Sequence, residues 1–215
     1  MPSTLRITEI FFSLQGEART VGIPTVFVRL TGCPLRCLYC DSAYAFSGGQ
    51  SLSLSAIIER VAQYSPQYVC VTGGEPLAQP GVHSLLTALC DRGYQVSLET
   101  SGALDVSNVD ARVSRVVDVK TPASGESARN SYANLAKLGL HDQVKFVICS
   151  EDDYHWSVSK CLEHDLVGRV GEVLFSPSYG VLEPRVLADW IVRDNLRVRL
   201  QLQLHKLLWN DEKGR

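Results

Sequence analysis

The sequence lacks a large net charge, because its 21 lysines and arginines nearly balance its 23 aspartates and glutamates. Proteins that bind nucleic acid by neutralising phosphates carry a clear basic excess, so we expect no direct nucleic-acid partner. The sequence also has no apolar run near the roughly 18 residues that cross a membrane. Its N-terminal apolar stretch is too short for a signal peptide. We therefore expect a cytoplasmic protein without a membrane partner.

A disulfide framework is also absent. The chain has seven cysteines, an odd number, and disulfides are rare in a reducing compartment. Three of the cysteines, Cys33, Cys37 and Cys40, fall within eight residues. The other four lie in apolar strand patterns or helical patterns, so we expect them in the core; they are Cys70, Cys90, Cys149 and Cys161.

Apolar strand patterns alternate with helical patterns along the chain. The strand patterns cover residues 25–31, 68–72, 95–101, 116–120, 142–149, 172–177 and 198–204. The helical patterns cover residues 54–61, 82–89, 128–138, 150–164 and 183–193. Such alternation is typical of βαβ units in a mainly parallel sheet. A closed eight-stranded barrel usually needs about 250 residues. We therefore predict an α/β fold in one domain over residues 1–215, a partial (β/α) barrel.

The three clustered cysteines have the spacing C-x3-C-x2-C in a loop after the first predicted strand. Structural zinc sites take four ligands, and no nearby cysteine or histidine completes four. Three thiolates would instead leave one iron of a 4Fe–4S cluster open to a substrate or cofactor. The alternative, three unrelated buried cysteines, fits poorly with a loop rich in glycine and proline. A second motif, TGGEP at residues 72–76, follows the next predicted strand.

These two motifs, with Tyr39 before the third cysteine, resemble the radical S-adenosylmethionine enzymes. Further segments resemble the 7-carboxy-7-deazaguanine synthases within that superfamily and span most of the chain: LQGE (14–17), GIPTVFVRLTGC (22–33), CDS (40–42), LETSG (98–102), DVKTPASG (118–125) and QLHK (203–206). This resemblance implies a lyase that converts 6-carboxy-5,6,7,8-tetrahydropterin to 7-carboxy-7-deazaguanine, with ring contraction and loss of ammonia. The reaction belongs to the 7-deazapurine (queuosine) pathway of tRNA modification.

The resemblance also implies the cofactors, which are a 4Fe–4S cluster, S-adenosylmethionine and Mg2+. Cys33, Cys37 and Cys40 would hold three irons, and S-adenosylmethionine would chelate the fourth. The residues implied for S-adenosylmethionine binding are Tyr39, Cys40, Asp41, Gly73, Gly74, Glu75, Ser101 and Lys120. In this group, glycine lets backbone carbonyls approach and the Glu75 carboxylate is expected to pair with the ammonium.

The Mg2+ ligand implied by the resemblance is Ser42, whose hydroxyl is a hard oxygen donor. The alternative is a serine that only caps the turn after the cysteines. The substrate-binding residues implied are Leu14, Gln15, Gly16, Glu17, Arg29, Thr72 and His205. Arg29 would pair bidentately with the substrate carboxylate, and a structural salt bridge is the alternative. Ala18 stands where the family often has glycine, so this loop is expected to differ in shape or to gain a contact from Arg19.

Two other functions stay open at this point. One is a glycyl-radical-enzyme activase of the same superfamily, and the other is an iron–sulfur electron-transfer or zinc-binding protein. A partial barrel leaves sheet edges that a second chain could cover, so we expect a homodimer. A cluster that needs reduction implies an external one-electron reductant of flavodoxin or ferredoxin type.

Overall fold

The computed structural model describes residues 4–210, 212 and 214. One nine-stranded sheet runs through it, in the order β3-β1-β2-β4-β5-β6-β7-β8-β9. The strands are β1 (Thr4–Leu14), β2 (Pro24–Leu30), β3 (Gln50–Ser53), β4 (Tyr68–Gly73), β5 (Gln95–Thr100), β6 (Ser114–Asp118), β7 (Gln143–Ile148), β8 (Glu172–Pro177) and β9 (Arg199–Leu200). The pairs from β2 to β9 are all parallel, whereas β1 is antiparallel to both β2 and β3. The sheet is therefore open and mainly parallel, which confirms the predicted partial barrel.

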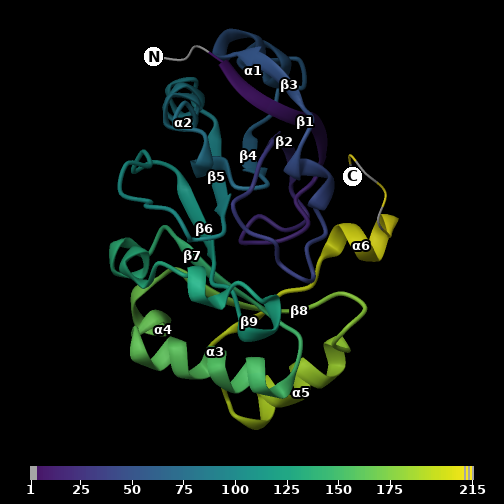
Figure 1. Cartoon of the computed structure of the whole chain (residues 1–215), viewed down its shortest axis with the longest axis vertical. Coiled ribbons are helices and arrows are strands. Elements are labelled where there is room, and N and C mark those ends of the chain that lie inside the picture. The colour runs from purple at the N-terminus through teal and green to yellow at the C-terminus, as the bar shows by residue number, and fades with distance from the viewer. Residues whose placement is uncertain (1–3, 211, 213, 215) are drawn as a thin grey trace.

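Six helices accompany the sheet in the described part of the chain. They are α1 (Leu54–Ala62), α2 (Val82–Asp91), α3 (Glu151–Glu163), α4 (Leu166–Arg169), α5 (Pro184–Arg193) and α6 (Leu204–Trp209). Helices α1 and α2 flank the first half of the sheet, and α3, α4 and α5 flank the last strands (Figure 1). None of the helices among these residues is long and apolar enough to cross a membrane.

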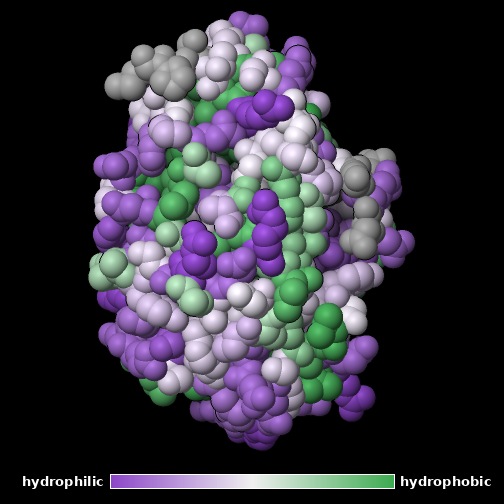
Figure 2. Space-filling view, in the orientation of Figure 1, coloured by the Kyte–Doolittle hydropathy of each residue, from purple (hydrophilic) through white to green (hydrophobic). Residues whose placement is uncertain are grey.

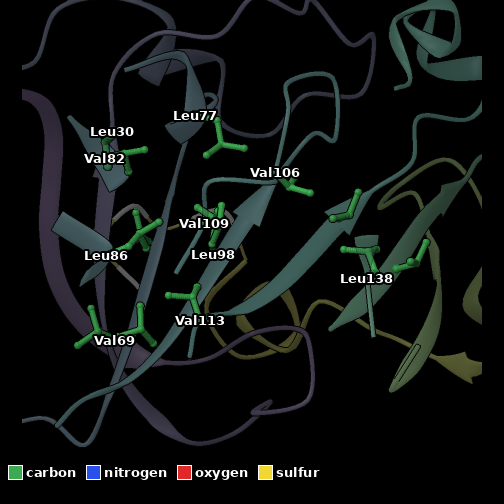
Figure 3. Close-up of a cluster of buried hydrophobic side chains, with 14 of the residues drawn as sticks. Leu30, Val69, Leu77, Val82, Leu86, Leu98, Val106, Val109, Val113 and Leu138 are labelled. Carbon is green, nitrogen blue, oxygen red and sulfur yellow. The ribbon is translucent and has the colours of Figure 1, made fainter. Parts of the chain in front are cut away.

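The apolar core lies between the sheet and these helices. Leu30 of β2, Val69 of β4 and Leu98 of β5 gather beside Leu86 of α2 (Figure 3), and all four are fully buried. Because side chains alternate between the two faces of a strand, the neighbours of these residues point to the inner face. That inner face is where the polar and charged strand residues lie.

All seven predicted strands have a counterpart in the sheet, the last of them only over Arg199–Leu200, but β1 and β3 were not expected. In β1, Leu5 and Ile7 are buried at alternate positions, and a register shift between Ile7 and Glu9 then interrupts the alternation. Two adjacent phenylalanines, Phe11 and Phe12, follow. A bulge of this kind removes the period of two that identifies a strand in a sequence.

Two predicted elements are wrong. Residues 128–138 form two short 3-10 turns, Ser127–Arg129 and Tyr132–Lys137, instead of one α-helix. Here the side chains of Asn130 and Asn134 hydrogen-bond to backbone groups of neighbouring loops, which competes with a regular helix. The last predicted strand stops at Leu200. Beyond it the chain leaves the sheet, and α6 begins where the Leu204 amide donates to the Gly16 carbonyl.

Three of the four cysteines predicted to lie in the core are buried, and one is not. Cys70, Cys90 and Cys161 are buried, whereas Cys149 is only half-buried because β7 ends at Ile148. The prediction is therefore correct for the three that lie inside regular elements. It is wrong for Cys149, which lies in the connection to α3.

Candidate active site

A cavity of about 270 Å3 opens on the inner face of the sheet at the carboxyl ends of its parallel strands. The loop that carries the three cysteines forms part of its wall, and so do β2, β4, β5, β6, β7 and the segment around α6. Of the predicted site residues, all of which the structure describes, those that line it are Leu14, Gln15, Gly16, Glu17, Arg29, Cys33, Cys37, Tyr39, Cys40, Asp41, Ser42, Thr72, Gly73, Gly74, Ser101, Lys120 and His205. Sequence segments far apart in the chain therefore meet at one site.

The cysteine loop is fixed by backbone hydrogen bonds on both sides. The Gly32 amide donates to the Ala45 carbonyl at 2.7 Å, and the Leu38 amide donates to the Ser124 carbonyl at 3.0 Å. All three cysteines are half-buried with their thiols free. Burial raises the pKa of the Cys33 and Cys37 thiols above the ordinary value. The loop thus presents three thiols to one cavity.

This arrangement fits a cluster better than a single ion. In the described part of the chain, no three histidine, cysteine, aspartate or glutamate side chains are grouped to hold one metal ion. An iron–sulfur cluster does not need such a group, because each cysteine holds a different iron. The donor set is three soft thiolates on one loop, which is the chemistry that an iron–sulfur cluster requires.

Gly73 and Gly74 pack the end of β4 directly against this loop. A Cβ on Gly74 would lie 2.9 Å from Cys33 Cβ, and one on Gly73 would lie 2.9 Å from the Leu30 amide nitrogen. Real side chains do not tolerate such distances, so only glycine fits at either position. The Glu75 amide, next in sequence, donates to the Gly32 carbonyl at 2.7 Å. The two motifs are therefore held in contact through their backbones.

Glu75 itself lies where the sequence did not place it. Its side chain is fully buried and does not line the cavity. Its carboxylate accepts hydrogen bonds from Thr100 Oγ1, from the Ser101 amide at 2.7 Å, from Ser101 Oγ at 2.6 Å and from the Leu77 amide at 3.0 Å. The structure therefore joins this carboxylate to the end of β5.

Charged side chains line the cavity next to the cysteine loop. Lys120 Nζ lies 3.0 Å from Asp118 Oδ2 and 5.9 Å from the centre of the Tyr39 ring. The other oxygen, Asp118 Oδ1, is buried and accepts no hydrogen bond from the described residues. A buried acceptor of this kind is costly unless it has a donor. It therefore indicates a ligand with N–H or O–H groups at this point of the cavity.

A second charged group lies deeper between the strands. Lys145 Nζ lies 2.5 Å from Glu17 Oε2 and 3.7 Å from Asp118 Oδ2. Burial disfavours the charged form of Lys145, but the carboxylates of Glu17, Asp118 and Glu99 outweigh burial and raise its pKa well above the ordinary value. Burial also raises the pKa of the Glu99 carboxyl, to which Thr72 Oγ1 donates at 3.2 Å.

Glu99, Asp118 and Lys145 were not among the residues predicted for the site. Each lies at an alternate position of an apolar strand, on β5, β6 and β7 respectively, and each lines the cavity. Asp118 and Lys145 are register partners in a parallel pair, so they share a face. A lone charge within an apolar strand is the signal in the sequence that could have identified them.

The predicted substrate residues Gly16, Arg29 and His205 also line the cavity. His205, in α6, packs on Gly16, where a Cβ would collide with its ring. Burial lowers the pKa of His205. Arg29 Nε donates to Glu9 Oε1 at 2.8 Å, and Arg29 also faces the cavity. Arg29 therefore forms the structural salt bridge that was the alternative, and it also lines the site where the substrate carboxylate was expected.

Comparison with known proteins places this geometry in a family. Residues 27–119 match the family model described as the radical SAM superfamily. The 7-carboxy-7-deazaguanine synthase of Chlorobaculum tepidum is 46% identical over 212 residues, which cover 97% of this chain and 96% of that protein. The chain belongs to the 7-carboxy-7-deazaguanine synthase family. The enzyme of that name from Koribacter versatilis is 42% identical and covers 97% of this chain and 98% of its own length.

A solved structure agrees with the fold of the synthase family. The crystal structure of QueE from Escherichia coli matches with a TM-score of 0.77 over 93% of this chain and 94% of that one, at 20% identity. At that identity the match shows the shared fold. Membership in the radical SAM superfamily implies a radical enzyme with a 4Fe–4S cluster and S-adenosylmethionine as cofactors.

The structure also explains the departure from the synthase pattern after residue 17. Ala18 is buried and has a φ of 64°, in the left-handed region that favours glycine. The loop therefore keeps the backbone that glycine would adopt. Arg19 points away from the cavity, where its side chain contacts the Leu140 carbonyl and Glu172 at 3.3 and 3.4 Å. The extra contact expected of Arg19 is thus made to the protein.

Proposed function

We propose that this chain converts 6-carboxy-5,6,7,8-tetrahydropterin to 7-carboxy-7-deazaguanine, with ring contraction and loss of ammonia. The observation that supports this reaction most is the shared cavity, which joins a three-cysteine loop to a charged barrel interior. The name of the relatives supports the same product. A pterin has several N–H donors and this substrate has a carboxylate, and the cavity offers carboxylates and an arginine.

The cofactor side of the cavity would be held by the residues nearest the cysteine loop. Cys33, Cys37 and Cys40 would bind the cluster, and the Gly73–Gly74 turn would leave room for the methionyl end of S-adenosylmethionine. When bound, the reduced cluster and S-adenosylmethionine supply one-electron radical chemistry. Ser101 and Lys120 would orient the cofactor. Glu75 would act through Ser101, whose backbone and side chain it fixes.

The substrate side would be held by the inner face of the strands. Arg29 would donate to the substrate carboxylate. Glu17, fixed by Lys145, would accept from the pterin N–H groups, and Thr72 and His205 would complete the pocket. Gln15 lies in the same turn as Glu17. Because these groups surround the ligand, they would also exclude water from the reacting carbon.

Ser42 is the residue that we propose as a Mg2+ ligand. It precedes the 3-10 turn Ala43–Phe46, yet its side chain makes no capping hydrogen bond there. This weakens the alternative that it only caps the turn. Its oxygen lies 3.8 Å from Cys40 Sγ and faces the cavity, so it is close to the proposed cluster. Mg2+ commonly takes few protein ligands and completes its shell with water and substrate.

We also propose a redox partner, a cytoplasmic location and a homodimer for this chain. An external one-electron reductant, a flavodoxin or a ferredoxin, would reduce the cluster in the cytoplasm. A homodimer is supported by exposed apolar surface, since hydrophobic side chains gather on one face over the region of α5 (Figure 2). Val181 before this helix is 63% exposed and Val186 within it is 38% exposed.

Anaerobic turnover tests the reaction directly. Reconstituted protein with the carboxylated tetrahydropterin, S-adenosylmethionine and dithionite should form 7-carboxy-7-deazaguanine and ammonia. Cofactor cleavage without a deazaguanine product would reject the proposal and favour the activase. Metal analysis separates the remaining class, because about four irons and four sulfides per chain support the cluster, whereas one zinc rejects it.

The Mg2+ role is tested in the same assay. Activity of the natural chain should rise on addition of Mg2+. Ser42→Ala should lose most of that response, and Ser42→Thr should keep it because threonine retains the hydroxyl. A Ser42→Ala variant with an unchanged response to Mg2+ would remove this assignment while leaving the reaction itself intact.

A further inference from the structure

The carboxylate behind Arg29, that of Glu9, lies outside the cavity. Glu9 of β1 is the register partner of Arg29 on the antiparallel neighbour β2. Residues directly opposite each other in such a pair project from the same face. The register shift between Ile7 and Glu9 sets this alignment, because it changes which residues of β1 share the inner face with Arg29.

Three groups fix the guanidinium of Arg29. Glu9 Oε1 accepts from Arg29 Nε at 2.8 Å, and the same oxygen accepts from Tyr44 Oη at 2.7 Å. The guanidinium carbon lies 5.7 Å from the centre of the Tyr44 ring and 6.0 Å from that of Phe11. Cation–π contact at these distances is favourable. The pair is shielded from water, with 18% of the Arg29 side chain and 22% of the Glu9 side chain exposed.

The free edge of the guanidinium faces the cavity. A guanidinium can bind a carboxylate in two parallel hydrogen bonds along either of two edges, one that includes Nε and one formed by the two terminal nitrogens. Glu9 occupies the Nε position. Neither terminal nitrogen donates a hydrogen bond to any residue that the structure describes, and Arg29 lines the cavity whereas Glu9 does not.

We infer that Glu9, supported by Tyr44, is a positioning residue that aims the terminal edge of Arg29 at the carboxylate of the substrate. Glu9 acts through its neighbours, since Arg29 and Tyr44 line the cavity and Glu9 does not reach it. Tyr44 lies in the turn that begins after Ser42, so the same contact ties the carboxylate site to the segment that follows the cysteines. This inference rests on the proposed function, because it takes the carboxylate of the pterin as the ligand of Arg29.

The consequence is selectivity for the carboxylated substrate. Without Glu9, Arg29 would keep its charge but lose its fixed orientation, and it would have to be ordered at each binding event. Loss of one oriented, charge-assisted contact should weaken binding of the carboxylated pterin about tenfold. Binding of a tetrahydropterin that lacks the carboxylate should change by less than about twofold, because Arg29 has no partner on that ligand.

Equilibrium binding measures this selectivity without turnover. Reconstituted protein with S-adenosylmethionine and no reductant is titrated anaerobically with 6-carboxytetrahydropterin and with tetrahydropterin. The ratio recorded is the Kd for tetrahydropterin divided by the Kd for 6-carboxytetrahydropterin. We expect the ratio to fall about tenfold in Glu9→Ala and about threefold in Glu9→Gln and Tyr44→Phe, which each keep part of the network.

Glu172 provides a matched control. It also pairs with an arginine, through Arg199 Nη1 at 2.9 Å, and its side chain is 26% exposed, but it does not line the cavity. Glu172→Ala should leave the ratio unchanged. If Glu9→Ala does not fold, as judged by circular dichroism, Glu9→Gln and Tyr44→Phe carry the test by themselves.

The outcomes separate this inference from the proposed function. A ratio that Arg29→Met leaves unchanged would show that Arg29 does not bind the carboxylate, which removes that part of the proposed function. A ratio that collapses in Arg29→Met but is unchanged in Glu9→Gln and Tyr44→Phe would overturn the positioning role alone. Equal weakening of both ligands in the Glu9 variants would also overturn it, because that result indicates general damage to the pocket.

Discussion

At the scale of single residues, Glu75 has protein partners that the sequence did not predict. The Gly-Gly-Glu stretch predicts a carboxylate that meets a ligand, but this carboxylate is enclosed by protein donors from Leu77, Thr100 and Ser101. A buried carboxylate with this many donors is a structural centre. These partners could not be predicted from the sequence, because Thr100 and Ser101 are 25 and 26 residues away in the chain.

Removal of the Glu75 carboxylate should therefore destabilise the fold. Glu75→Ala leaves buried donors without an acceptor, so we expect the free energy of unfolding to fall by about 3 kcal/mol. Urea denaturation measures this value. Glu59→Ala, on the exposed side of α1, is the control and should change it by less than about 0.5 kcal/mol. A Glu75→Ala variant as stable as the control would mean that these hydrogen bonds contribute nothing net.

His205 predicts a pH dependence. Its pKa is lowered in the folded state by burial, so the unfolded chain binds more protons as the pH falls below the ordinary value near 6.5. Stability should therefore decrease on acidification from pH 7.5 to pH 5.5. The decrease should be smaller in His205→Gln, which cannot take up that proton. Urea denaturation of both proteins at the two pH values checks this, and equal decreases would contradict it.

At the scale of elements, the turn between β1 and β2 carries a local strain. Ala18 holds a φ of 64° inside a buried turn that crosses to β7, where the Arg19 amide donates to Gln143 Oε1 at 2.7 Å. A left-handed conformation at a residue other than glycine costs about 1–2 kcal/mol. The turn keeps this conformation because hydrogen bonds hold it on both sides of Ala18, from the Gly22 amide to the Gln15 carbonyl and from the Arg19 amide to Gln143.

Ala18→Gly should stabilise the chain for this reason. We expect a gain of about 1 kcal/mol, since relief of the left-handed strain exceeds the greater flexibility of glycine in the unfolded chain. Thermal denaturation measures the change. The same substitution in the middle of α2, Ala88→Gly, should instead destabilise by about 1 kcal/mol. Destabilisation by Ala18→Gly would show that the turn is not strained.

At the scale of the whole molecule, the interior of the barrel holds a buried lysine between carboxylates. Glu17 reaches Lys145 from the loop after β1, and Lys145 is also close to Asp118 on β6. The first and the later strands of an open sheet are thus bridged across the interior by one ammonium. Without it, two or more carboxylates would face one another in a site shielded from water.

Lys145→Met should accordingly weaken the fold and the pocket together. We expect a loss of about 3 kcal/mol in the free energy of unfolding, because the buried carboxylates lose their counter-charge. The loss should shrink in acidic buffer, where these carboxylates can take up protons. Lys137→Met, in an exposed ion pair with Asp105, is the control and should change little. A Lys145→Met variant as stable as that control would contradict the bridging role.

Much of this molecule follows from local patterns. The parallel strands β2 and β4 to β8 have apolar strand patterns, and the cysteine loop has a spacing that needs no tertiary information. The helix α3 begins where Ser150 Oγ accepts from the Asp153 amide at 3.2 Å, a capping contact between residues three apart. In each case the atoms that decide the structure are close in the chain.

The sequence by itself determined the ligand types, the fold class and the family. Only the tertiary structure decided that Glu75 serves Ser101, that Glu99, Asp118 and Lys145 share the cavity, and that Glu9 is paired with Arg29. The physical reason is that side-chain periodicity fixes which residues share a face of one strand, whereas partners on neighbouring strands depend on register. A single bulge in β1 changes that register, and residues 9 and 29 meet because of it.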